Sequence, residues 1–200
     1  LISCFSLTVI SCAKRDHEHD STANTTPDTT TINFVGGTAS GFVLTSADGT
    51  NWTSRETAAT NSIMDVIYEN SKFVAVGLYG IILTSSEGTT WDNRTTGTSD
   101  HHVGVTYGNS KFVTVGLSGR NFYSSDGTTW TEGNINNTSD LYGITYGNSK
   151  FVAVGDSGTI ITSSDGDSWD NSTSGTSEEL KDVTYGNSTF VVVGGSGTIL

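Results

Sequence analysis

Histidines and carboxylates are the residues of this chain that could hold a metal ion, and their spacing does not favour one. His17 and His19 lie among three acids in the stretch DHEHD at 16–20, which could bind a metal only loosely because no rigid element holds it. His101 and His102 are adjacent in a segment that we expect to be a strand, so their side chains point to opposite sides and cannot chelate one ion together. We therefore expect no metal site and no cofactor.

Repeated Asp-Gly turns could suggest calcium, and Ser, His and Asp could suggest nucleophilic catalysis. Each turn supplies a single carboxylate, whereas Ca²⁺ takes about 6–8 oxygen ligands. No nucleophile elbow or other characteristic spacing links a Ser to a His and an Asp. The sequence thus predicts no catalytic residue. The arrangement of its expected strands and turns is more informative about the fold.

Those elements repeat with a fixed period. The stretches SADGTNW, SSEGTTW, SSDGTTW and SSDGDSW end at tryptophans 52, 91, 130 and 169, which are 39 residues apart. Within one unit, DLYGITY, KFVAVG, TIITSS and DSWDNST read as four short strands separated by Gly-, Asn- and Asp-containing turns. Four antiparallel strands in a repeat near 40 residues are typical of a β-propeller blade, so the predicted fold class is an all-β propeller.

The repeat also divides the chain. We predict full blades at 62–100, 101–139 and 140–178, with partial blades at 32–61 and 179–200. The first unit is expected to lack its innermost strand because Thr29 occupies the repeat position of Tyr68. Closed propellers have about 4–8 blades. Three full and two partial blades therefore predict an incomplete ring, and in a complete protein we expect the missing first strand to come from the C-terminus and close the ring.

The recurrent turn motif joins the third and fourth strands of each unit. Gly supplies the positive φ, the acid accepts backbone N–H bonds, and the Trp packs back on the blade. The predicted structural turn residues are Ser46, Asp48, Gly49, Trp52, Ser85, Glu87, Gly88, Trp91, Ser124, Asp126, Gly127, Trp130, Ser163, Asp165, Gly166 and Trp169. The motif resembles the Asp-box of BNR-repeat propellers, although it is one residue shorter than the usual Ser/Thr-x-Asp-x-Gly-x-Thr-Trp.

Phrases such as YGNSKFVAVGDSGTIITSSDG also resemble bacterial exported propellers with WD40/YVTN/BNR-like repeats. That superfamily includes sialidases and photosystem II assembly-factor-like proteins, so the resemblance implies a propeller but not one function. A sialidase-like glycoside hydrolase would need three clustered arginines and a Tyr–Glu pair. Arg55 and Arg94 fall on outer strands and Arg120 lies alone at a turn. We expect a non-catalytic module; the alternative is a hydrolase whose catalytic residues lie in blades outside this sequence.

The first residues carry an address signal. LISCFSLTVISC, residues 1–12, is apolar and ends in Val-Ile-Ser-Cys, which resembles the lipidation site of bacterial lipoproteins, with Cys12 preferred over Cys4. Residues 13–31 read as a flexible tether, and no Cys lies in the repeats. We expect an extracytoplasmic protein that is held to the cell envelope only by a lipid. A net charge of −12 argues against nucleic acid and anionic membrane surfaces as partners.

Comparison of the repeats with one another locates a candidate binding surface for a protein or a glycan. The turn between strands 1 and 2 and the Asp-box turn scarcely vary, whereas the turn between strands 2 and 3 and the start of strand 1 do. Variable loops on a rigid scaffold are a common place for recognition. The candidate ligand-binding residues are Tyr79, His101, His102, Ser118, Arg120, Tyr142, Asp156, Glu178, Glu179 and Lys181. Neutral drift of surface loops, or a structural role without a discrete ligand, would also give this variation.

Overall fold

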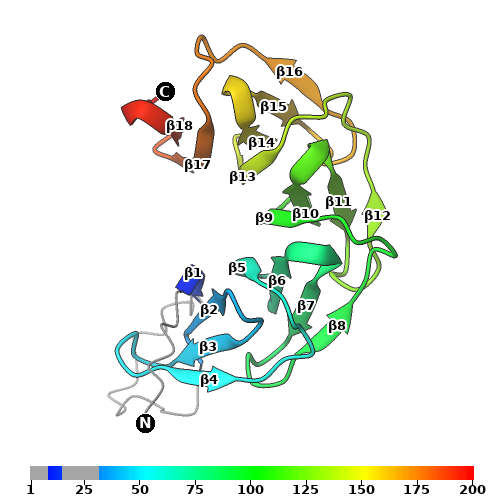
Figure 1. Cartoon of the computed structure of the whole chain (residues 1–200), viewed down its shortest axis with the longest axis vertical. Helices are drawn as coiled ribbons and strands as arrows, with labels where there is room; N and C mark the ends of the chain where they lie inside the picture. The colour runs from blue at the N-terminus through cyan, green and yellow to red at the C-terminus, as the bar shows by residue number, and fades with distance from the viewer. Residues whose placement is uncertain (1–8, 15–31) are drawn as a thin grey trace.

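The computed structural model describes residues 9–14 and 32–200, and it shows small antiparallel sheets arranged along an open arc (Figure 1). Each sheet is a meander in which strands adjacent in sequence are hydrogen-bonded neighbours. Blade 1 contains β1 (Val9–Lys14), β2 (Phe34–Thr38), β3 (Val43–Ser46) and β4 (Thr53–Arg55). Blade 2 contains β5 (Ile63–Glu69), β6 (Lys72–Gly77), β7 (Ile82–Ser85) and β8 (Asp92–Arg94).

The remaining blades repeat this order. Blade 3 contains β9 (His102–Gly108), β10 (Lys111–Gly116), β11 (Asn121–Ser124) and β12 (Thr131–Glu132). Blade 4 contains β13 (Leu141–Gly147), β14 (Lys150–Gly155), β15 (Ile160–Ser163) and β16 (Asp170–Ser172), and blade 5 contains β17 (Leu180–Gly186) and β18 (Thr189–Gly194). The first strand of each blade lies nearest the centre of the arc and the fourth lies outermost (Figure 1). This is the architecture of a β-propeller, as the repeat predicts.

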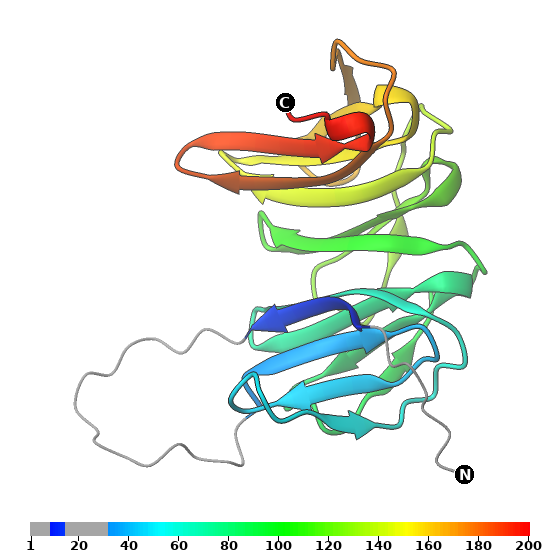
Figure 2. The same cartoon turned by 60° about the vertical axis from the view of Figure 1, so that its left-hand side comes forward.

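The core lies between the blades, which stack face to face (Figure 2). Side chains of one strand alternate between two such layers. In β10, Phe112 packs with Val74 and Val76 of blade 2, whereas Val113 and Val115 pack with blade 4. A second strand that is apolar on both faces is therefore what this stacking requires, and it explains the phrase FVAVG.

The connections have geometries that their residues favour. The turn between the first two strands has Asn148 and Ser149 at φ values of 46° and 58°, a left-handed conformation that Asn tolerates well. The second and third strands are joined by short 3-10 turns, namely η1 (Leu78–Gly80), η2 (Leu117–Gly119), η3 (Asp156–Gly158) and η4 (Gly195–Gly197). Gly80 has φ of +77°, and a Cβ there would lie 2.3 Å from the Thr98 carbonyl oxygen. Equivalent contacts with a carbonyl oxygen occur at Gly119 and Gly158, whereas at Gly197 only the positive φ of +77° favours Gly.

The structure differs from the sequence prediction in blade 1. The prediction leaves this unit without an innermost strand, but β1 pairs antiparallel with β2 along its length, with Cys12 opposite Gly36. The physical reason is that β2 is buried in its blade and would otherwise present unpaired backbone groups, which a segment of strand-forming residues satisfies. The predicted signal remnant (1–12) and tether (13–31) thus both contribute to a strand, and their other residues lie outside the described part of the chain. Within the described ranges, no helix has the length and apolar character needed to cross a membrane.

Candidate functional site

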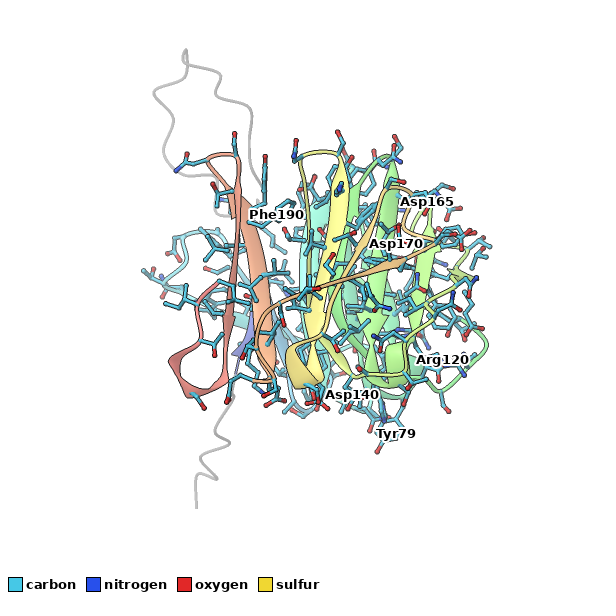
Figure 3. All side chains as sticks on the ribbon, turned by 90° about the horizontal axis from the view of Figure 1, so that it is seen from above. Tyr79, Arg120, Asp140, Asp165, Asp170 and Phe190 are labelled. Carbon is cyan, nitrogen blue, oxygen red and sulfur yellow. The ribbon has the colours of Figure 1, made fainter. Side chains whose placement is uncertain are left out.

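The turns divide between two opposite faces of the arc. Tyr79, Arg120 and Asp140 lie on one face, and Asp165 and Phe190 lie on the other (Figure 3). We name the first the variable-turn face; it carries η1–η4 and the residues that precede β5, β9, β13 and β17. We name the second the constant-turn face; it carries the turns between the first two strands and the motif turns, which join the third and fourth strands and end at Trp52, Trp91, Trp130 and Trp169.

The polar atoms of the motif turns on the constant-turn face form hydrogen bonds within the chain. Asp126 accepts hydrogen bonds from the backbone N–H groups of Thr128 (2.7 Å) and Thr129 (2.9 Å), and Ser124 Oγ accepts one from Gly127 N–H (2.8 Å). These bonds, led by that from Thr129, hold the pKa of the Asp126 carboxyl below its ordinary value. Asp126 is therefore the hydrogen-bond acceptor that closes this turn.

The tryptophans of the motif behave as expected for packing residues, with a gradient along the arc. Trp130 and Trp169 are buried, whereas Trp52 in blade 1 is 38% exposed. The indole N–H of Trp130 donates to the Gly127 carbonyl within its own turn. Glu87, the one departure from Asp in the motif, accepts from the hydroxyls of Thr89 and Thr90.

Lysines on the same face connect neighbouring blades. Lys72 donates from blade 2 to the backbone carbonyl of Asp126 in blade 3, and Lys111 donates from blade 3 to that of Asp165 in blade 4 at 2.9 Å. Lys111 also lies over the Tyr123 ring, 4.6 Å from its centroid. The motif turn thus binds a lysine of the preceding blade, which is a second structural reason for its constancy.

The innermost strands form a cleft at the centre of the arc. It has a volume of about 370 Å³. Its lining comes from β5, β9, β13 and β17: Met64, Asp65, Val103, Gly104, Tyr142, Gly143, Ile144, Lys181 and Asp182. The cleft combines an apolar floor with one aromatic ring, two carboxylates and one amine, which is the usual composition of a recognition site.

Tyr142 and Lys181, two of the predicted site residues, are brought together in this cleft. The Lys181 ammonium lies 4.9 Å from the Tyr142 ring centroid and 2.6 Å from a carboxylate oxygen of Glu179. Partial burial, together with the negative charges of Glu179, Asp140 and Asp156, raises the pKa of Tyr142 to about 12. The Lys181 contact lowers the pKa of Glu179. Tyr142 is therefore a neutral phenol at physiological pH, beside a carboxylate.

Tyr79 and His101 form a second pair on the variable-turn face. Their rings meet edge to face with centroids 4.6 Å apart, and His101 Nδ1 accepts from the Tyr79 backbone N–H. Tyr79 has φ of 59° and is 59% exposed. The same repeat position is Ser118, Ser157 and Ser196 in later blades, so an exposed aromatic ring in this conformation is a departure from the repeat.

Most other predicted site residues lie on this face but are partly engaged within the chain. The backbone N–H of Ser118 donates to Asp140 Oδ1 at 2.8 Å, that of Asp156 to the Asp140 carbonyl, and Ser196 Oγ to Glu178. The sequence suggests that Arg120 lies alone at its turn. In the structure it forms ion pairs with Glu132 and Asp100.

The arginines do not converge on one site. Arg55 and Arg94 lie in the outermost strands of blades 1 and 2, where each donates to a Thr hydroxyl of its own blade, Thr45 and Thr84 respectively. Among the described residues, no three His, Cys, Asp or Glu side chains gather in a way that could hold a metal ion. His17 and His19 lie outside those residues.

The prediction that His102 belongs to the binding surface is wrong. Its side chain is 0% exposed and packs edge to face on Phe122, with ring centroids 5.3 Å apart, so it cannot touch a ligand at the surface. The repeat explains the burial: His102 occupies the position of Ile63, Leu141 and Leu180, which point into the layers between blades. Neither ring nitrogen has a hydrogen-bond partner among the described residues. Desolvation consequently lowers the pKa of His102 to about 4, against the opposing charge of Asp100.

Of the residues that line the cleft, the sequence predicted only Tyr142 and Lys181. Met64 and Val103 share the repeat position of Tyr142 and Lys181, so the variation at that position already contained the signal. Asp65 and Asp182 occupy the next position, which is Gly in blades 3 and 4. Asp65 also accepts the backbone N–H of Val105 at 2.9 Å and so joins blade 2 to blade 3.

Comparison with known proteins supports the fold class. No protein-family profile and no curated protein sequence matches the chain. Among solved structures, YCF48 bound to D1 peptide superposes with a TM-score of 0.68 at 15% identity, covering 97% of this chain and 63% of that one. YCF48 from Cyanidioschyzon merolae gives 0.63 at 17% identity, covering 82% of this chain and 65% of that one.

A structure of a nidogen/laminin complex gives a TM-score of 0.68 at 13% identity, covering 93% of this chain and 72% of that one. At such identities the likeness shows a common fold, and the chain spans less than two thirds of the YCF48 chains. The molecule is therefore described by its class, a β-propeller of four-stranded blades.

Proposed function

We propose that the chain is a non-catalytic binding module whose variable-turn face holds a segment of a protein partner. The central cleft carries this proposal, because it places Tyr142, Lys181 and Met64 from three different blades around one hollow. The exposed Tyr79 extends the surface beyond the cleft. The solved structures of the same fold include one with a bound peptide and one of a protein complex, which agrees with this use of the fold.

The charges favour a basic or neutral segment. Asp65 and Asp182 line the cleft, and the Lys181 ammonium is already paired with Glu179. The chain as a whole has a net charge of −12, so an acidic ligand would approach against repulsion. Tyr side chains provide large contact areas at a small entropic cost and are common anchors of such interfaces.

Peptide display against the immobilised full chain tests this proposal. We expect selected peptides to be enriched in Lys, Arg and apolar residues and to lose about tenfold or more in affinity on Tyr142→Ala or Met64→Ala. Asp170→Ala, an exposed substitution on the outermost strand of blade 4, is the matched control and should leave affinity unchanged. Selection of acidic peptides, or equal affinity for all three variants, would overturn the proposal.

We further propose that the protein is extracytoplasmic and is anchored by a lipid on Cys12. The support is the apolar segment that ends in Val-Ile-Ser-Cys and the polar residues that follow. Processing before Cys12 would remove Val9–Ser11 and leave only Cys12–Lys14 of β1. With its leader, the protein should incorporate labelled palmitate in a bacterial host, Cys12→Ala should abolish the label and Cys4→Ala should not. Labelling that depends on Cys4 instead, or no labelling, would contradict this assignment.

A further inference from the structure

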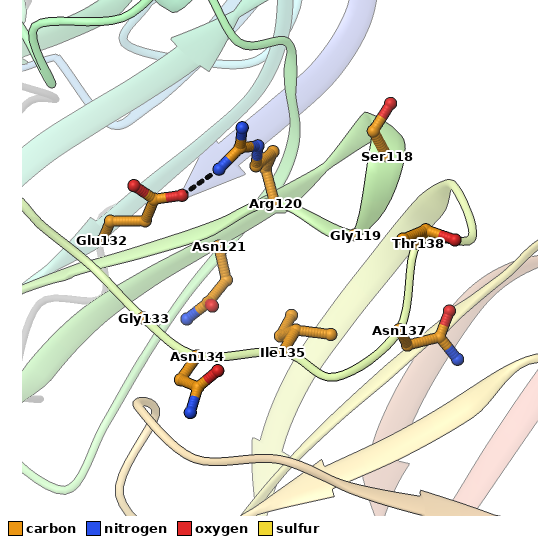
Figure 4. A pocket seen from close by; sticks show the side chains of 10 residues that line it. All are labelled: Ser118, Gly119, Arg120, Asn121, Glu132, Gly133, Asn134, Ile135, Asn137 and Thr138. Atoms are coloured by element: carbon orange, nitrogen blue, oxygen red, sulfur yellow. Dashed lines mark hydrogen bonds and ion pairs between the residues drawn. The ribbon is translucent and has the colours of Figure 1, made fainter.

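A second hollow lies away from the central cleft, in blade 3 beside the connection to blade 4 (Figure 4). It has a volume of about 380 Å³ and is bounded by η2, the start of β11 and the loop that follows β12. Its walls include Ser118, Asn121, Asn134, Ile135 and Thr138. The volume falls in the range of about 300–1,000 Å³ that is usual for small-molecule pockets.

Two departures from the repeat create this hollow. Asn121 stands where blades 1, 2 and 4 have Val43, Ile82 and Ile160, and Gly133 stands where blades 1 and 2 have Arg55 and Arg94. In blade 2, Arg94 lies opposite Ile82 in the β7–β8 pair and so covers it. The corresponding hollow in blade 1, lined by Gly41, Phe42, Glu56, Thr57 and Ala59, measures only about 120 Å³. Loss of the arginine side chain thus opens the pocket in blade 3.

Asn121 supplies an unused hydrogen-bond acceptor in the wall. The residue is 1% exposed, and its Nδ2 donates to the Gly166 carbonyl of blade 4 at 3.0 Å. Its Oδ1 has no hydrogen-bond partner in the described part of the chain. A buried amide oxygen without a partner is destabilising, and an apolar residue would fill the same position without that cost. A donor from a bound molecule, reaching it beside Gly133, would satisfy this oxygen.

The rest of the lining determines which molecule would fit. Within the described chain, the Ser118 and Thr138 hydroxyls and the Asn134 amide form no side-chain hydrogen bond, so they present both donors and acceptors. The charged residues at the rim, Arg120 and Glu132, are paired with each other (Figure 4). The lining holds no aromatic ring to stack on a planar ligand. A neutral ligand with several hydroxyl groups matches these properties.

We infer that this pocket binds one sugar ring of a neutral saccharide, with its hydroxyl groups donating to Asn121 and exchanging hydrogen bonds with Asn134 and Thr138. This pocket shares no lining residue with the central cleft, so the inference does not depend on the proposed protein interface.

Side-chain amide signals of the ¹⁵N-labelled full chain provide the test. D-glucose, D-galactose and N-acetyl-D-glucosamine are each titrated to about 50 mM, well above a millimolar dissociation constant. We expect at least one to shift the Asn121 and Asn134 amide signals saturably. The double variant Asn121→Ile/Gly133→Arg installs the blade 2 pair, and it should remain folded and lose the response at Asn134.

A second variant protects the test against misfolding of the first. Asn134→Ala alters only an exposed side chain and should weaken saccharide binding about tenfold. The absence of a saturable shift with all three sugars would overturn the inference. So would an unchanged response at Asn134 in the folded double variant, or unchanged affinity in Asn134→Ala.

Discussion

The two faces of this propeller arise from the same 39-residue unit and use it in opposite ways. On the constant-turn face, Asp126 bonds to its own turn, and Lys72 and Lys111 donate to the motif turn of the next blade. On the variable-turn face, Tyr79 extends into solvent and Tyr142 lines a cleft. Positions that repeat on the constant-turn face hold the blades together, whereas departures from the repeat are exposed at Tyr79 and buried at His102.

The largest effect on the free energy of unfolding is expected at His102, a buried residue that departs from the repeat. Below pH 6.5 the unfolded chain takes up a proton on His102, whereas the folded chain does so only near its pKa of about 4. Stability should therefore fall as the pH drops from about 6.5 to about 4, by an amount on the order of 3 kcal/mol, and this contribution should be constant below that range. His102→Leu should raise stability and remove this slope in urea titrations across the pH range.

The neighbouring histidine provides the control. His101→Gln changes a half-buried residue of the variable-turn face and should leave the slope in place. Because the pKa values of Asp126 and Asp165 are lowered in the folded state, their stabilisation is present above about pH 4 and lost below it. Acid unfolding at still lower pH should consequently persist in His102→Leu. A slope that survives His102→Leu would show that another group titrates.

The next effect concerns the constant-turn face. Asp126→Ala removes the acceptor of two backbone N–H groups in an exposed turn and should lower the free energy of unfolding by about 1 kcal/mol. Asp170→Ala is the control, since Asp170 is exposed and forms no side-chain bond with the described residues. Urea midpoints that move equally for both variants would show that the hydrogen bonds to Asp126 are not specifically stabilising.

A smaller effect is expected from the contacts between blades. Lys111→Met removes the bond to the Asp165 carbonyl and the contact with Tyr123, and should cost about 0.5–1 kcal/mol. Lys150→Met alters the lysine at the same repeat position in blade 4, which has no bonding partner among the described residues, and should be neutral. Equal loss of stability in both would contradict the role of the lysine as a link between blades.

The smallest effect on stability is expected at the exposed aromatic residue. Tyr79→Ser installs the residue of the three later turns and should change the free energy of unfolding by less than about 0.5 kcal/mol. A thermal or urea scan measures this change. A large loss would mean that the Tyr79–His101 contact is structural, and the case for a binding surface at η1 would then fail.

The sequence is informative about the fold because each local signal recurs in phase. The Asn-containing turns, the doubly apolar FVAVG strands and the Asp-box turns all agree on one four-stranded unit. The part played by β1 could not be predicted, because Val9–Lys14 shares no repeat position with the other innermost strands and its pairing is decided by the open edge of β2.

The site was only partly predictable for a related reason. Variation between repeats identifies Tyr142 and Lys181, but it does not reveal which side of the strand each varied position faces. His102 varies and is buried, whereas Met64 varies and lines the cleft. The Asn121 pocket depends on two positions, 121 and 133, that lie opposite one another only after β11 and the chain beyond β12 come together.

A paired measurement on two triple variants tests the division between the faces most directly. One combines Asp126→Ala, Lys72→Met and Lys111→Met; the other combines Tyr79→Ser, Tyr142→Ala and Met64→Ala. The account predicts that the first loses about 2–3 kcal/mol of stability and, where folded, binds peptides selected on the native chain with nearly native affinity. The second should keep most of its stability and lose at least about tenfold in affinity. The opposite pattern, with affinity lost on the constant-turn face and retained on the variable-turn face, would contradict the account.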